Sequence, residues 1–332
     1  MPDFSVLAGT DVLALLEGRE NDIIELVRQA YMVHDAGNSV NPDSYFLRFP
    51  EKPDSRIIAL PGYLGGPVNT AGIKWIASFP GNVSQGMQRA SAVLVLNDYQ
   101  TGYPFALLEA AGINAERTAA SAALAATILG VAPSATIGVV GAGVIARTIL
   151  RYLAAVGISL MEVRCHDLDE NSQRAFVDHL GTRHHAGASP ASLTEAVACD
   201  LVVLATTTQR PYVPATIALR PGQLLLNVSL RDLAPETLLT VNNVLDDVEH
   251  CLKAGTSPHL AEQLTGNRDF VTGTLAGVIR GEARLDPMRP TVFSPFGLGI
   301  LDIALGHFLY SLAVAEGRLL NIPNFFGETR RW

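Results

Sequence analysis

Residues 135–146 read Ala-Thr-Ile-Gly-Val-Val-Gly-Ala-Gly-Val-Ile-Ala, an apolar run that leads directly into a glycine turn. The pattern G-x-G-x-x-[GA], carried by Gly141, Gly143 and Ala146, is typical of a dinucleotide-binding βαβ unit. Its first glycine permits the tight turn, its second lets the backbone approach a pyrophosphate, and its last small residue allows close packing of helix and strand. The stretch predicts a strand, a phosphate-binding turn and a helix. The alternative is a packing turn in another α/β sheet.

An acidic residue follows at the spacing that this fingerprint requires. The segment 162–167 reads Glu-Val-Arg-Cys-His-Asp, which places Asp167 at the end of the next expected strand. Its carboxylate would accept a hydrogen bond from a ribose 2′-hydroxyl and repel a 2′-phosphate. Asp169 and Glu170 add negative charge nearby, and Arg164 is the only local cation. These residues favour NAD over NADP as the cofactor.

The second half of the chain alternates strands and helices, which predicts a Rossmann-type, doubly wound parallel sheet. We expect its strands near residues 135–140, 161–166, 200–205, 223–228 and 242–245. Short polar segments follow two of these strands, at the edge where an open α/β sheet binds ligands. The alternative for both segments is ordinary turn chemistry. With the glycine turn, they give these expected cofactor contacts: Gly141, Ala142, Gly143, Val144, Ile145, Asp167, Thr206, Thr207, Ser229 and Leu230.

The first half has a different sequence pattern, in which turn residues separate short β-like runs. This pattern predicts a mostly antiparallel sheet. We expect strands at 45–49, 56–60, 72–79, 91–97 and 104–108. Two helices are expected within residues 11–34, with Asn21 as an N-cap. Asn114 is expected to cap a helix over Ala115–Leu129, and Gly297–Glu316 reads as a long amphipathic helix that returns to the first half. The fold class is therefore α/β, a Rossmann sheet plus an α+β domain.

Composition narrows the class of protein. The chain has 332 residues, 48% apolar and 17% charged, with a formal net charge of −8, so we expect two soluble domains and no nucleic-acid partner. Three cysteines without a CxxC pair indicate reduced thiols in the cytoplasm. No basic leader and no unbroken apolar run of membrane length is present, so no membrane association is expected. His179, His184 and His185 lie among polar residues, and we expect no metal site.

Two cations stand in apolar surroundings. Lys74 lies within Gly-Ile-Lys-Trp-Ile, and Arg117 precedes the apolar stretch 119–126. Each could bind a substrate carboxylate, since a guanidinium near a helix start gives a cationic site. The alternatives are a solvated strand face for the lysine and a surface position for the arginine.

Several motifs in order resemble the ornithine cyclodeaminase/μ-crystallin family across roughly residues 40–315. They are Gly72-Ile-Lys74-Trp with Phe79-Pro-Gly-Asn82, Thr101-Gly-Tyr-Pro104, Leu108-Glu109, Arg117-Thr-Ala-Ala120, the glycine fingerprint and Asn227 to Asp232. The resemblance implies a substrate-binding and dimerisation domain, residues 1–115 and 300–332, and an NAD-binding Rossmann domain, residues 116–299. It implies a cytoplasmic homodimer acting on a small amino-acid substrate. It also implies an active-site set of Arg48, Lys74, Arg117 and Asp232, with Lys74 and Asp232 catalytic.

One segment departs from the ornithine-cyclising members, which tend to carry Gly-Gly-Asp-x-Pro-Gly-Lys. Here residues 230–236 read Leu-Arg-Asp-Leu-Ala-Pro-Glu, which keeps the aspartate but loses the lysine. The segments around Arg48, Arg89 and Ser91, and Ser294-Pro-Phe-Gly297, look more like N-(2-amino-2-carboxyethyl)-L-glutamate dehydrogenases, which make 2,3-diaminopropionate for siderophores and peptide antibiotics. That likeness adds Arg89 to the substrate contacts, and Ser91 and Arg117 to the cofactor contacts.

Other activities stay open at this point. The sibling alternatives are ornithine cyclodeaminase, alanine dehydrogenase and ketimine reductase. An alternative from another class is a crystallin-like protein that binds a nucleotide without turnover. The kept aspartate favours an enzyme over that last alternative.

Overall fold

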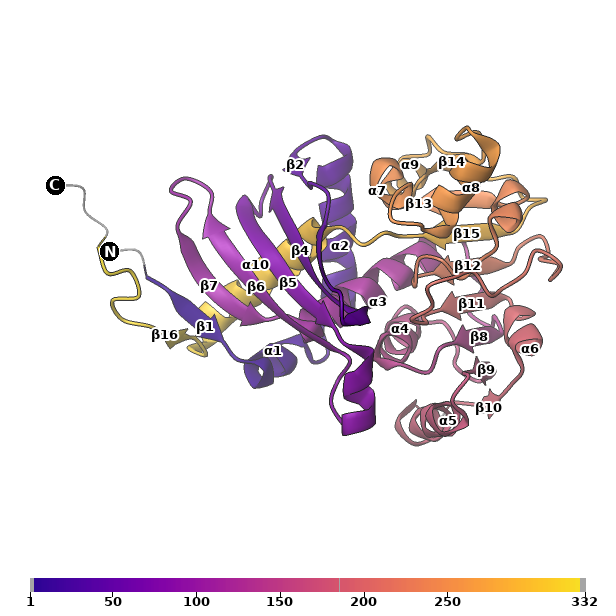
Figure 1. Cartoon of the computed structure of the whole chain (residues 1–332), viewed down its shortest axis with the longest axis horizontal. Coiled ribbons are helices and arrows are strands. Elements are labelled where there is room, and N and C mark those ends of the chain that lie inside the picture. Colours follow the sequence, from indigo (N-terminus) through magenta and orange to yellow (C-terminus); the bar gives the residue numbers. More distant parts are fainter. Residues whose placement is uncertain (1–2, 185, 329–332) are drawn as a thin grey trace. The chain divides into compact units, whose positions relative to one another are not determined.

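The computed structural model describes residues 3–184 and 186–328. The chain forms two compact units (Figure 1). Unit 1 comprises Met1–Arg117 and Leu298–Trp332, and unit 2 comprises Thr118–Gly297. One helix, α3 (Ala111–Ile128), continues from the end of unit 1 into unit 2.

Unit 1 is built on an eight-stranded sheet with the order β16-β1-β7-β6-β5-β4-β2, with β3 also paired to β4. All neighbours are antiparallel except β1 and β7. The expectation of a mostly antiparallel sheet is confirmed. The strands are β1 (Ser5–Leu7), β2 (Ser39–Val40), β3 (Tyr45–Phe49), β4 (Lys52–Leu64), β5 (Thr70–Ser78), β6 (Ala90–Asp98), β7 (Pro104–Glu109) and β16 (Leu320–Asn321).

Helix α10 (Gly299–Glu316) covers the inner face of this sheet, with α1 (Gly9–Leu16) and α2 (Glu20–Asp35) beside it (Figure 1). Alternate residues of β6, namely Ala92, Leu94 and Leu96, are buried, and Leu94 and Leu96 lie against Gly306 of the helix. The helix is long and apolar enough to cross a membrane by length and composition, and 56% of it is buried within the fold. The expectation of an amphipathic helix, with one apolar and one exposed side, is wrong for the first half of α10. Every residue from Gly299 to Gly306 is buried.

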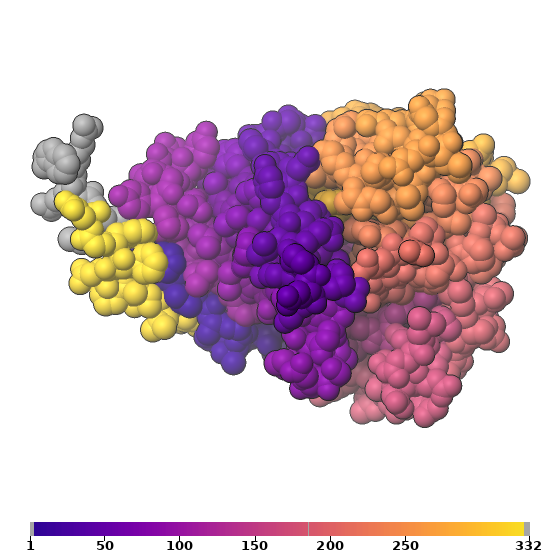
Figure 2. Space-filling model, viewed as in Figure 1, coloured from indigo at the N-terminus to yellow at the C-terminus, as the bar shows by residue number. Residues whose placement is uncertain are grey.

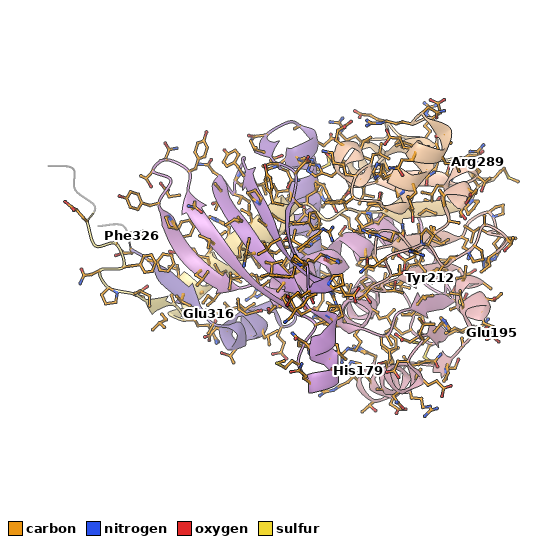
Figure 3. All side chains as sticks on the ribbon, viewed as in Figure 1. His179, Glu195, Tyr212, Arg289, Glu316 and Phe326 are labelled. Atoms are coloured by element: carbon orange, nitrogen blue, oxygen red, sulfur yellow. The ribbon has the colours of Figure 1, made fainter. Side chains whose placement is uncertain are left out.

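The first and last strands of the chain meet in unit 1. β16 pairs antiparallel with β1, and the C-terminal segment lies against the N-terminal one on the surface (Figure 2). The rings of Phe4 and Phe325 stack at 3.8 Å, and Phe326 (Figure 3) meets Phe4 edge-on.

Unit 2 contains an all-parallel sheet with the order β10-β9-β8-β11-β12-β15-β13-β14, which confirms the doubly wound expectation. The central strands are buried along their whole length, as parallel strands covered on both faces must be. The strands are β8 (Ile137–Val140), β9 (Val163–His166), β10 (Ala188–Pro190), β11 (Leu201–Leu204), β12 (Leu224–Asn227), β13 (Asn242–Leu245), β14 (Val271–Thr274) and β15 (Thr291–Ser294).

Short helices connect these strands. Ser192 starts α6 with a capping box in which Glu195 (Figure 3) returns a hydrogen bond. The remaining helices are α4 (Val144–Ala155), α5 (Glu170–His184), α6 (Leu193–Val197), α7 (Val248–Cys251), α8 (Ser257–Thr265) and α9 (Leu275–Ile279), with 3-10 turns η1 (Pro80–Gln85) and η2 (Pro235–Leu239).

Two expected helix starts are wrong. Helix α2 begins at Glu20, so Asn21 lies inside its first turn. Helix α3 begins at Ala111, four residues earlier than expected, because the Glu109 carboxylate accepts the N–H groups of Ala111 and Gly112. This acid satisfies helix-start donors from outside the helix, which frees the Asn114 side chain for another contact.

Candidate active site

The inner face of the unit 1 sheet holds a buried lysine. Lys74 is 1% exposed and lies in β5 between Leu60 of β4 and Leu94 of β6. Its Nζ donates to Asp302 Oδ2 at 2.6 Å and to Asn114 Oδ1 at 2.8 Å. The alternative of a solvated strand face is therefore wrong for Lys74.

Arg117 completes this cluster from helix α3. Its Nε donates to Asp302 Oδ1 at 3.3 Å, and its Nη2 donates to Asn114 Oδ1 at 2.8 Å. The side chain is buried, so the surface alternative is wrong. Because α3 begins at Ala111, Arg117 lies in the second turn and gains little from the helix-start dipole that the sequence suggested.

The surroundings of Lys74 change its acidity. Burial lowers the pKa of Lys74 to about 8, the negative charge of Asp302 opposes this shift, and the positive charge of Arg117 adds to it. The Lys74 ammonium is therefore within reach of deprotonation near neutral pH, which suits a group that takes part in chemistry.

Arg48 and Arg89 lie on the same face of the sheet as Lys74, in a second group. Arg48 of β3 pairs across with Arg56 of β4, which pairs with Ser78 of β5. The Arg89 Nη1 donates to Ser78 Oγ at 2.6 Å. Ser78 is four residues from Lys74 along β5, about 13 Å at strand spacing. The structure therefore divides the four expected cations into two groups, Lys74 with Arg117 of α3 and Arg48 with Arg89, and it adds Arg56 to the second group.

In unit 2, the glycine turn has the conformation that a bound pyrophosphate requires. Gly141 has φ +97°, and a Cβ there would lie 2.5 Å from the Ala205 carbonyl oxygen. A Cβ on Gly143 would meet nothing within 4 Å, so the backbone there is open to an approaching group. Val144 and Ile145 form the first turn of α4, and Ala146 is fully buried against the sheet. These residues fit a dinucleotide at the helix start.

Asp167 follows β9 and reaches back to the same turn. Its Oδ2 accepts the Ala142 N–H at 2.7 Å, and its Oδ1 accepts the Asp169 N–H at 2.9 Å. The carboxylate thus lies beside the turn where a ribose would follow the pyrophosphate.

Asp232 is fully buried, and hydroxyl groups hold its carboxylate. Thr206 Oγ1 donates to Oδ1 at 2.8 Å, and Ser229 Oγ donates to Oδ2 at 2.5 Å. Thr206 follows β11 and Ser229 follows β12, so the C-terminal ends of two adjacent strands fix this side chain. The two hydroxyls expected to contact the cofactor, those of Thr206 and Ser229, also hold Asp232.

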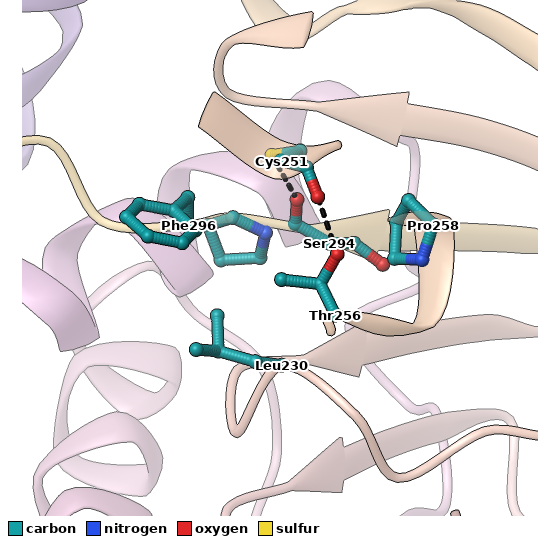
Figure 4. A pocket seen from close by; sticks show the side chains of 7 residues that line it. Leu230, Cys251, Thr256, Pro258, Ser294 and Phe296 are labelled. Carbon is teal, nitrogen blue, oxygen red and sulfur yellow. Dashed lines mark hydrogen bonds between the residues drawn. The ribbon is translucent and has the colours of Figure 1, made fainter. Parts of the chain in front are cut away.

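The turn before Asp232 is strained. Leu230 has φ +80°, a conformation that a leucine rarely adopts. Its side chain lines a pocket with Cys251, Thr256, Pro258 and the segment 294–296 (Figure 4). Cys251 donates to the Ser294 carbonyl at 3.1 Å, which ties that segment to the pocket wall. Such strain persists where the surrounding packing determines it, commonly at functional sites.

Some expected residues do not join these clusters. Ser91 is exposed on the opposite face of β6 from Leu94 and therefore from Lys74, and Thr207 is exposed after β11. His185 lies outside the described residues. Within residues 3–184 and 186–328, no three acidic, histidine or cysteine side chains converge as metal ligands.

Sequence reasoning missed three residues of the site. In the sequence, Asn114 reads as a helix cap and Asp302 as part of an amphipathic helix. Tyr212 (Figure 3) donates its backbone N–H to the Asp232 carbonyl. Burial, followed by the charge of Asp232, raises the pKa of Tyr212, so its hydroxyl stays protonated. A lone acid within residues 298–315 is the one signal that pointed to Asp302.

Comparison with known proteins shows the family and the relatives of this chain. Residues 9–317 match the model of the ornithine cyclodeaminase/mu-crystallin family. The chain is 30% identical to an alanine dehydrogenase of Archaeoglobus fulgidus, over 89% of this chain and 91% of that protein. It is 28% identical to the N-((2S)-2-amino-2-carboxyethyl)-L-glutamate dehydrogenase of Staphylococcus aureus, over 90% of this chain and 93% of that protein.

Solved structures agree with this relationship. The Δ1-pyrroline-2-carboxylate reductase of Thermococcus litoralis, solved with NADH and L-proline, superposes with a TM-score of 0.87 at 25% identity, over 96% of this chain and all of that one. An archaeal alanine dehydrogenase dimer with bound NAD gives 0.85 at 27%, over 98% of this chain and all of that one. The chain belongs to the ornithine cyclodeaminase/mu-crystallin family.

Proposed function

We propose that this protein is the NAD-dependent dehydrogenase that converts N-(2-amino-2-carboxyethyl)-L-glutamate to L-2,3-diaminopropionate and 2-oxoglutarate. Membership of the family gives the reaction class: the chain is an NAD(P)-dependent amino-acid dehydrogenase or reductase. The cations of unit 1 support the choice of substrate.

The observation that carries the substrate proposal is the state of Arg89. Its guanidinium is partly buried, and burial lowers the pKa of Arg89 with no acid opposing the shift. Within the described part of the chain, its hydrogen bond is to a neutral serine, and no ion pair is formed. A desolvated cation without a carboxylate partner is costly, so Arg89 is suited to bind an anion from outside the protein.

Two separated groups of cations suit a ligand that carries several carboxylates. Lys74 and Arg117 form one group, while Arg89 and Arg48 lie about 13 Å further along the strands of the same face. Long arginine side chains can shorten that separation. N-(2-amino-2-carboxyethyl)-L-glutamate has three carboxylates, whereas alanine has one and would leave the second group unused.

The proposed reaction oxidises the secondary amine of the substrate to an imine, which water then cleaves to the keto acid and the diamino acid. When bound, NAD⁺ would accept the hydride in this oxidation. Lys74 and Arg117 bind the glutamate α-carboxylate and orient the reacting carbon. Asp232 removes the amine proton before oxidation and later activates the attacking water, as a general base.

The test is direct. Purified protein is incubated with NAD⁺ and each candidate substrate, and NADH formation is followed by absorbance. The proposal expects turnover of N-(2-amino-2-carboxyethyl)-L-glutamate with release of 2-oxoglutarate. Preferred oxidation of L-alanine would instead support the second candidate, an alanine dehydrogenase, which the 30% identity favours. Proline and ammonia from ornithine would overturn both.

Arg89→Ala is expected to separate large from small substrates. Loss of a charge-assisted contact to a carboxylate costs about 1.5–3 kcal/mol, so kcat/KM for the tricarboxylate should fall by about 10–150-fold. Any turnover of L-alanine should change little, since alanine has no second carboxylate. The matched control is Arg174→Ala, an exposed arginine paired with Glu170 in unit 2. An equal loss for both substrates would contradict a role in substrate choice.

Cofactor choice is expected to depend on Asp167. Replacement by alanine removes the proposed ribose acceptor and the repulsion of a 2′-phosphate, so NADH affinity should fall by about tenfold or more while NADPH affinity holds or improves. Titration of both cofactors by protein fluorescence measures this. Asp178→Ala, an exposed aspartate of α5, is the control. Tighter binding of NADPH than NADH by the wild type would remove Asp167 from cofactor selection.

The outer face of the unit 1 sheet is the proposed dimer surface. Register places apolar residues side by side on this face, and several are exposed: Tyr45 70%, Leu47 46%, Trp75 42% and Val93 38%. A contiguous apolar sheet face of this kind marks an interaction site. The archaeal alanine dehydrogenase is a dimer, which supports a second copy as the occupant. Sedimentation velocity should give a dimer for the wild type and a monomer for Trp75→Glu.

A further inference from the structure

A buried carboxylate that the sequence did not reveal lies at the centre of the unit 1 cluster. Asp302 is fully buried in helix α10, and its two oxygens are divided between two cations: Oδ2 accepts from Lys74 and Oδ1 from Arg117. Asn114 accepts from the same two cations through its Oδ1. The four side chains form a closed arrangement drawn from α3, α10 and β5.

Lys74 depends on this arrangement for its charge. A buried ammonium without a partner loses its proton, since desolvation disfavours the charged form. Its cross-strand neighbours, Leu60 and Leu94, are apolar and offer no compensation. The charges that act on it are those of Asp302, which favours the ammonium, and Arg117, which disfavours it.

The charges of the cluster do not cancel. Lys74 and Arg117 contribute two positive charges and Asp302 one negative charge, which leaves one net positive charge. This remainder matches one carboxylate. Without Asp302 the two cations would repel each other, and the lysine would lose its proton to relieve the repulsion.

We infer that Asp302 is a positioning residue, which keeps Lys74 protonated and aimed together with Arg117, so that the pair presents a single net positive charge to the substrate carboxylate. This inference rests on the proposed function for the identity of the anion, but its effect on Lys74 is a property of the free enzyme. It can therefore be tested without any substrate.

The test is possible because the chain has few lysines, namely Lys52, Lys74 and Lys253. Selective ¹³C labelling of lysine gives three Cε signals, and the Lys74 signal is identified by its loss in Lys74→Met. A pH titration of the free enzyme then reads the pKa of Lys74 directly. Asp302→Asn keeps the shape of the side chain and removes its charge.

We expect Asp302→Asn to lower the pKa of Lys74 by about one to three pH units from its value near 8, because an adjacent opposite charge shifts a pKa by that amount. Asp22→Asn, an exposed aspartate of α2, should leave that pKa unchanged. The wild-type kcat/KM should fall as pH rises through about 8, and in Asp302→Asn this fall should begin at correspondingly lower pH.

A second variant covers the case in which Asp302→Asn does not fold. Arg117→Met removes the repelling charge and leaves Asp302 to Lys74 alone, so the pKa of Lys74 should rise. An unchanged Lys74 pKa in either folded variant would overturn the inference. The ion pairs of Asp302 with Lys74 and Arg117 would then be purely structural. If the NMR shifts appear but none of the candidate substrates is oxidised, the proposed function fails while the role of Asp302 stands.

Discussion

Asp232→Asn is expected to leave the binding of NADH and of the amino-acid substrate intact and to lower kcat by about 10²–10⁴-fold, the usual contribution of a general base. Asparagine has the shape of aspartate and can still accept from Thr206, but it cannot take a proton. In the native protein, Thr206 and Ser229 fix the carboxylate in one orientation at the ends of β11 and β12. The loss should therefore fall on kcat rather than on KM.

The control for this variant is Asp269→Asn, an exposed aspartate of the same unit. Steady-state kinetics and NADH titration of both variants make the comparison. Near-normal turnover in Asp232→Asn would remove Asp232 from the mechanism. A rise in KM with unchanged kcat would assign it to substrate binding instead.

Lys74→Met is expected to lower both activity and stability. Loss of one preorganised charged donor at a reacting centre typically lowers kcat by about 10²–10³-fold. The free energy of unfolding should fall by about 3 kcal/mol, because the Asp302 carboxylate stays buried with one of its two cations removed. Methionine fills a similar volume, so lost packing contributes little.

Urea unfolding and initial-rate kinetics measure the two effects separately. Lys52→Met, which replaces an exposed lysine of β4, is the matched control and should change neither. Combining Lys74→Met and Asp302→Leu with Arg117→Met removes all three charges of the cluster and should recover most of the stability but none of the activity. Recovery of activity in the triple variant would show that these charges have no chemical role.

The pattern of residues along the chain predicted one mostly antiparallel and one parallel sheet, with five strands of each. Strands at 137–140, 163–166 and 201–204 were visible because parallel strands covered on both faces must be apolar throughout. The antiparallel strands 45–49 and 104–109 were visible because turns separate them at short intervals. The glycine turn was visible because Gly141 needs a positive φ that other residues resist.

Helix starts were harder to predict from the sequence. The groups that accept hydrogen bonds from the first N–H groups of a helix need not belong to that helix. Glu109 caps α3 from the end of β7, so the polar residue that looked like a cap, Asn114, was free to join the cations. Six strands were not predicted, and each is two to four residues long, which gives little pattern to recognise: β1, β2, β10, β14, β15 and β16.

By itself, the sequence determined which residues carry charge into apolar surroundings: Lys74 and Arg117 stood out for that reason. Only the tertiary structure decided what these charges face. Asp302 lies 228 residues from Lys74 along the chain, and the return of α10 onto the sheet brings their atoms to 2.6 Å. Charge interaction depends on distance in space and on burial, and neither quantity is written in the order of the residues.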